Sequence, residues 1–124
     1  MYFQENFPII QKAAFDLITL LSNKDYKGFL ELVDSTDMKK EESLSDFEYL
    51  QTLFEEIDID QPSVVPYPEE RFCYYERLDQ KGYALDCQLT TNGRPNHYIL
   101  NLQFIKQSDT EQFTIHFDGV HCSY

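Results

Sequence analysis

The sequence has no tryptophan, few glycines and no long apolar run. A membrane-spanning helix needs about 18 or more consecutive apolar residues, so we predict no transmembrane segment. Residues 1–8 have neither the basic start nor the long apolar stretch of a secretory signal. We therefore expect a cytoplasmic protein.

Cysteine is also scarce, since Cys73, Cys87 and Cys122 are an odd number at wide spacing. Disulfide-stabilised domains are usually shorter and richer in cysteine, so we expect reduced thiols. The sequence has no Gly-rich phosphate loop, no G-x-S-x-G motif and no nucleotide-binding fingerprint. It therefore predicts neither an enzyme nor a bound cofactor.

Basic residues are few, with 10 Lys and Arg against 22 Asp and Glu and a net charge of −12. This sign argues against nucleic-acid binding, which depends on neutralising phosphates, and against an anionic membrane surface. It favours a basic protein partner, because complementary fields speed encounter. The simpler interpretation, that acidity only keeps the protein soluble, stays open.

Apolar and aromatic residues are plentiful, at 42% and 15% of the 124 residues. That composition excludes a disordered chain, and a chain of this length fits one domain over residues 1–124. In the first half, apolar residues recur with helical spacing over 8–22, 24–34 and 45–57. Pro8 suits the first turn of a helix, and Ser45-x-x-Glu48 is a capping box.

Residues 61–70 contain three prolines and predict an extended link, so helices occupy about 8–57 and the sheet about 71–124. Beyond Arg71 the apolar period falls to two, and Asn92-Gly93 is the strongest turn signal. Further turns are expected at 79–82 and 107–111, with a bulge at Asp118-Gly119. We predict an α+β fold in which three N-terminal helices pack on one face of a four-stranded antiparallel meander.

The acids concentrate in one segment. Residues 31–60 hold eleven Asp and Glu against Lys39 and Lys40, which is nine of the twelve net negative charges. Such an asymmetry is typical of a docking surface for a basic protein, or of a solvated helix face. The predicted partner-binding residues are Glu31, Asp34, Asp37, Glu41, Glu42, Asp46, Glu55, Glu56, Asp58 and Asp60.

Metal and nucleophile sites are weaker alternatives. Asp58-x-Asp60 is rich in oxygen, but the twelve-residue calcium loop is absent. His116 and His121 would point to opposite faces of a regular strand, which disfavours zinc. A pair of Cys87 with His97 is not excluded by spacing, yet Cys87 falls on the apolar face, where a thiol is inert.

The polar face of the predicted sheet is a second candidate surface. It would offer many hydrogen-bonding groups and few charges to a partner, or simply face water. Its predicted members are Asp86, Gln88, Thr90, His97, Asn101, Gln103, Gln112, Thr114 and His116.

The pattern of helices followed by a curved meander resembles the cystatin-like and NTF2-like α+β folds. It rests on the short second helix after Leu21 and on the hairpin of 98–104 with 113–121. The hairpin is similar to the end of small bacterial proteins, some of which look like immunity proteins of contact-dependent inhibition and other polymorphic toxin systems. Such families share a role and not a sequence, so no functional residue is transferred.

The resemblance implies an immunity protein that neutralises a cognate basic toxin domain, often a nuclease, by covering its active site with an acidic surface. When free, it would be a monomer or weak dimer. One alternative is an NTF2-like small-ligand binder or enzyme with a pocket between helices and sheet. Another is a homo-oligomeric adaptor module that uses the sheet face or an edge strand.

Overall fold

The computed structural model of the chain describes residues 2–38, 40–107 and 112–122, with side chains from Phe7 onward. It is an α+β structure with three α-helices and a five-stranded mixed sheet. The helices are α1 (Tyr2–Ser22), α2 (Tyr26–Leu32) and α3 (Asp46–Phe54), with a 3-10 turn, η1 (Glu69–Arg71). The strands are β1 (Ser35–Thr36), β2 (Phe72–Glu76), β3 (Gly82–Thr91), β4 (Arg94–Lys106) and β5 (Phe113–Cys122).

Helix α1 begins at Tyr2, so the predicted start at Pro8 was wrong and the proline lies inside the helix. Proline has a helical φ and lacks only one donor, and here the chain continues in helical geometry on both sides of it. The end of the helix agrees with the prediction, because Lys24 adopts a φ of 59° and turns the chain toward α2. The capping box of α3 is also confirmed, since the Ser45 hydroxyl accepts from the Glu48 N–H and the Glu48 carboxylate accepts from the Ser45 N–H.

The predicted four-stranded antiparallel sheet was wrong in one strand. The sheet has the order β1-β5-β4-β3-β2, and β1 runs parallel to β5 within the connection between α2 and α3, where no strand was predicted. The Asp34 and Asp37 N–H groups donate to the carbonyls of Ile115 and Phe117, at 2.8 and 2.9 Å. The Asp34 carboxylate in turn accepts from the Ile115 N–H at 2.7 Å.

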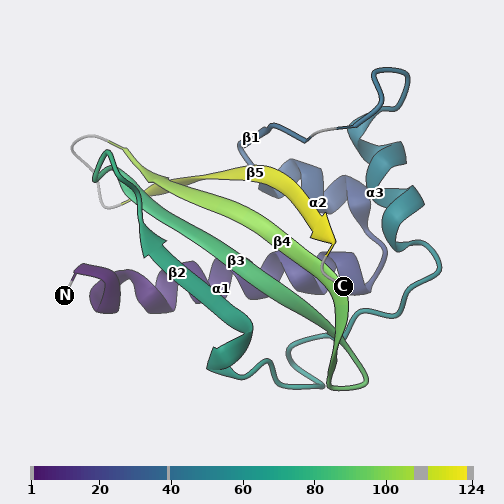
Figure 1. Cartoon of the computed structure of the whole chain (residues 1–124), viewed down its shortest axis with the longest axis horizontal. Coiled ribbons are helices and arrows are strands. Elements are labelled where there is room, and N and C mark those ends of the chain that lie inside the picture. Colours follow the sequence, from purple (N-terminus) through teal and green to yellow (C-terminus); the bar gives the residue numbers. More distant parts are fainter. Residues whose placement is uncertain (1, 39, 108–111, 123–124) are drawn as a thin grey trace.

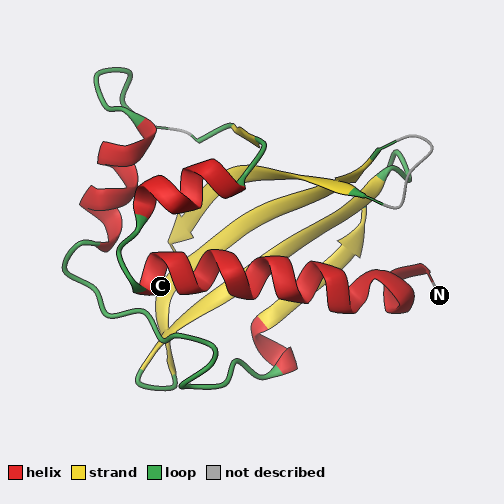
Figure 2. Ribbon diagram, turned by 180° about the vertical axis from the view of Figure 1, so that it is seen from behind, coloured by secondary structure: helices red, strands yellow, loops and turns green. Residues whose placement is uncertain are grey.

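The helices do not form one layer. Figures 1 and 2 show α1 crossing one face of the sheet, whereas α3 lies beside the end of β5. Contacts between aromatic rings connect these elements. The ring centroids of Phe29 in α2 and Phe117 in β5 are 5.0 Å apart, and those of Phe54 in α3 and Tyr98 in β4 are 5.3 Å apart. None of the helices in the described ranges is both long enough and apolar enough to cross a membrane.

The predicted inward faces of the strands form the core. Leu85, Cys87, Leu89 and Leu100 are fully buried, together with Leu17 and its neighbours on α1. Alternation therefore predicted which side of the central strands meets the helices. The predicted turn at 107–111 is described only at Gln107, because 108–111 lie outside the described residues.

The expected bulge in β5 is present and changes which side chains at the end of the strand face outward. Asn101 pairs with Gly119 and Leu102 with Phe117, so Asp118 is the extra residue. Gly119 has a φ of 120°, which favours glycine. Because the bulge shifts the alternation by one, His116 opposite Gln103 and His121 opposite Ile99 lie on the same outer face.

Candidate functional site

The predicted partner-binding acids lie mostly at the surface. Eight of the ten are exposed, Asp46 is half-buried and Asp60 is buried. Glu48, on the first turn of α3, is exposed as well. Most of these acids lie on α2, α3 and the chain between them, at one end of the molecule (Figure 1). We call the exposed acids the acidic surface: Glu31, Asp34, Asp37, Glu41, Glu42, Glu48, Glu55, Glu56 and Asp58.

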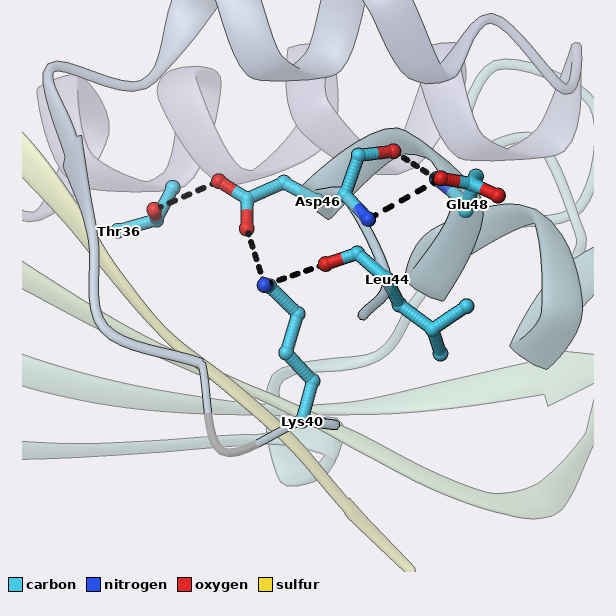
Figure 3. A network of polar contacts seen from close by, with 6 residues as sticks. Thr36, Lys40, Leu44, Asp46 and Glu48 are labelled. Atoms are coloured by element: carbon cyan, nitrogen blue, oxygen red, sulfur yellow. Dashed lines mark hydrogen bonds and ion pairs between the residues drawn. The ribbon is translucent and has the colours of Figure 1, made fainter. Parts of the chain in front are cut away.

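The described lysine within this segment is occupied internally. The ammonium of Lys40 donates to the Leu44 carbonyl at 2.6 Å and lies 3.6 Å from the Asp46 carboxylate. Asp46 also accepts a hydrogen bond from the Thr36 hydroxyl, and this bond connects β1 to the start of α3 (Figure 3). Asp46 is therefore a structural acid, and Lys40 does not neutralise the exposed ones.

The other end of α3 is held by Lys24. Its ammonium donates to the carbonyls of Phe54 and Ile57, at 2.8 and 2.7 Å. A cation is favourable at the carbonyl end of a helix, where the last carbonyls lack intrahelical partners. The two lysines thus serve α3 itself. Among the described residues, one acid of the acidic surface forms an ion pair: the Glu31 carboxylate lies 4.0 Å from the Lys27 ammonium. Both groups are exposed to solvent, so this pair contributes little energy.

The capping box sets where α3 starts and can be tested directly. We expect Ser45→Ala to lower the free energy of unfolding by about 1 kcal/mol, because the Glu48 N–H loses its acceptor. Urea unfolding followed by circular dichroism measures it. The matched control is Ser43→Ala, an exposed serine before the helix, which should change stability by less than about 0.5 kcal/mol. Equal losses in the two variants would show that the cap does not stabilise the helix.

Asp60 is not part of the acidic surface. Its side chain is only 9% exposed, and its carboxylate accepts from the Thr90 hydroxyl at 2.6 Å and from the N–H groups of Asn92 and Gly93 at 2.9 and 2.7 Å. Its own N–H donates to the Thr90 carbonyl. Asp60 therefore fastens the link after α3 to the β3–β4 turn, and we exclude it from the interface.

Two adjoining hollows open beside α3. The first has a volume of about 800 Å³ and is lined by the largely apolar side chains of Leu44, Tyr49 and Leu53 together with Lys40, Glu41 and Thr52. The second, of about 270 Å³, lies between Tyr49 and the bulged part of β5, with Asn101, Asp118 and His121 in its wall. Burial raises the pKa of Tyr49, and the Cys122 thiol adds to this. Sequence reasoning missed both hollows. The first is formed by the chain of residues 40–53 as it folds back on α3, and the second needs Tyr49 of α3 to meet β4 and β5.

The polar face of the sheet bonds largely to itself. The Asp86 carboxylate accepts from the Tyr75 hydroxyl and from the Asn101 amide, and Asp118 accepts from the Gln103 amide at 2.7 Å. The prediction that Thr90 belongs to this polar face was wrong, because Thr90 is only 2% exposed and its hydroxyl donates to Asp60. His97 lies in an irregular part of β4 with a φ of 80°. The remaining predicted members, apart from the exposed Gln112, are half-buried.

The described residues do not form a metal site or a Cys–His nucleophilic pair. No three His, Cys, Asp or Glu side chains there gather closely enough to hold a metal ion. Cys87 is fully buried, which raises the pKa of its thiol, while His97 is exposed. His116 and His121 share a face, but the His116 ring contacts Ser35 and Asp118.

Comparison of the chain with protein-family models, with curated proteins and with solved structures gives no match. The site must therefore be interpreted from its own geometry and charge.

Proposed function

We propose that this protein binds a basic protein partner through the acidic surface and neutralises it, as an immunity protein does for a cognate toxin domain. One observation supports the proposal, the distribution of charged groups around α3. Nine acids are exposed there, whereas Lys40 and Lys24 are held by hydrogen bonds to carbonyl oxygens of the protein itself. The ammonium groups keep their charge, but the exposed acids outnumber them, so the field around α3 is negative.

A nuclease domain fits this surface in chemical terms. An enzyme that holds nucleic acid must be basic around its active site, because phosphate contacts dominate its affinity. An acidic protein that covers this site competes with the substrate and is guided to it by long-range attraction. The partner class therefore follows from complementarity of charge.

The packed core argues against the ligand-binding alternative. A pocket between α1 and the sheet would occupy the space that Leu17, Ile18, Leu85 and Leu100 fill, and each of these is fully buried. The hollows described above lie beside α3 instead. We therefore favour a binding surface over an internal pocket.

A pull-down from the native organism tests the proposal. We expect the protein to recover a basic protein at low salt and less of it at moderate salt, because the Debye length is only about 10 Å at 0.1 M. The recovered protein, expressed alone, should stop growth, and co-expression of this chain should restore it. A partner that is acidic, or growth that is not restored, would contradict the proposal.

A further inference from the structure

Tyr49 lies between the two hollows, and its position suggests how a partner is recognised. It lines both of them, so a bound chain can reach one from the other across the tyrosine ring. Tyr49 and Leu53 are one helical turn apart on α3 and present a continuous apolar wall. Tyr49 is half-buried, and tyrosine is among the residue types that are enriched at interface anchor points.

The second hollow is built to accept hydrogen bonds. Asp118 carries a carboxylate, and Gln103 and His116 hold that carboxylate in place. The Asn101 amide donates one N–H to Asp86 at 2.7 Å, and its amide oxygen is able to accept a hydrogen bond. No Lys or Arg is among the described residues that line this hollow. The bulge creates the space, since Gly119 has no side chain at this point.

We infer that the partner inserts an apolar side chain into the hollow of Leu44, Tyr49 and Leu53, and a neighbouring Lys or Arg side chain into the hollow of Asn101 and Asp118. This inference rests on the proposed function, because charge complementarity selects the occupant. Burial of the apolar side chain supplies affinity. The cation gains a carboxylate, an amide oxygen and the Tyr49 ring.

Nuclear magnetic resonance titration with a defined probe tests this inference. The probe is the peptide acetyl-Lys-Leu-Arg-Leu-Lys-amide, added to the isotopically labelled full chain. We expect shifts of the backbone amides of residues 49–53 and 118–121. Citrulline in place of the Arg keeps the shape and removes the charge, and should weaken binding roughly 10-fold or more. A peptide with citrulline in place of one terminal Lys has the same net charge and serves as its control.

A protein variant closes the comparison. Asp118→Asn should weaken binding of the parent peptide and leave the Arg-to-citrulline peptide unaffected, whereas Asp16→Asn, an exposed acid on α1, should change neither. Thermal melting confirms that both variants are folded. Glycine in place of both Leu should remove the shifts at 49–53.

The outcomes separate this inference from the proposed function. Shifts confined to the acidic surface, with both citrulline peptides equally weakened, would overturn the two-hollow inference and leave the acidic interface standing. An absence of shifts at the hollows and at the acidic surface would overturn both. Loss of binding only with the Arg-to-citrulline peptide, reproduced by Asp118→Asn, supports the inference.

Discussion

Replacing Asp60 with alanine should lower the free energy of unfolding by about 3 kcal/mol, since hydrogen bonds to a charged group each contribute roughly 1.5–3 kcal/mol. The change removes the acceptor of the Thr90 hydroxyl and of two turn N–H groups. Thr90 and Asp60 are buried, although Asn92 and Gly93 are exposed, so water replaces the carboxylate poorly at the Thr90 hydroxyl. A domain of ordinary stability, about 5–15 kcal/mol, would lose a substantial part of it.

Urea unfolding of Asp60→Ala beside Asp58→Ala measures this effect. The Asp58 side chain is exposed, so its removal should change stability by less than about 0.5 kcal/mol. Thr90→Val removes only the hydroxyl that donates to Asp60. We expect its loss in the free energy of unfolding to lie between those of the other two variants, at about 1 kcal/mol, because a single hydrogen bond is lost. A loss in Asp60→Ala as small as in Asp58→Ala would show that the β3–β4 turn does not depend on this carboxylate.

Reversing four acids to lysine, Glu41, Glu42, Glu55 and Glu56, should slow association with the captured basic partner roughly 10- to 100-fold at low salt. Electrostatic steering raises association rates by about 10 to 1000-fold, and these acids are exposed and lie on both sides of α3. Asp34 is left unchanged, because its carboxylate accepts from the Ile115 N–H. Surface plasmon resonance at several salt concentrations gives the rates.

The control for the reversal has the same change in net charge at another place. Asp16, Glu69, Glu70 and Glu76 are exposed acids outside the acidic surface, and we expect their reversal to slow association much less. Equal slowing by both variants would mean that total charge, rather than this surface, attracts the partner. Unchanged urea midpoints would establish that neither variant is unfolded.

Much of the fold could be predicted from local signals. Alternation of apolar residues located the buried faces of β3 and β4, because side chains of a strand point to opposite sides. Ser45 and Glu48 located the start of α3, since they satisfy each other's backbone N–H groups. Asp118-Gly119 located the bulge that reshapes the end of β5.

Two of the three errors share a physical cause, which is contact between distant segments. A two-residue strand such as β1 has no period to detect, and the Ile115 and Phe117 carbonyls define it. Pro8 was treated as a helix start, although its φ is also compatible with a helix interior. Asp60 was counted with the exposed acids, because no local pattern indicates that it meets the turn at Asn92.

The candidate site was predicted as a charge and not as a shape. Composition located the acidic segment, and eight of its ten predicted residues are exposed. Lys40 and Lys24 donate to carbonyls at the two ends of α3, and Asp46 accepts from Thr36. No local sequence pattern indicates these contacts. The second hollow at Tyr49 needs α3 and β5 to be side by side, whereas the first is formed within residues 40–53.

Hydrogen–deuterium exchange of the protein, alone and in a one-to-one complex with the captured basic partner, tests most directly which surface binds. We predict slower exchange in residues 31–58 on complex formation, with the backbone amides of β2, β3 and the start of β4 unchanged. Protection confined to those strand amides, with residues 31–58 exchanging as in the free protein, would contradict binding through the acidic surface.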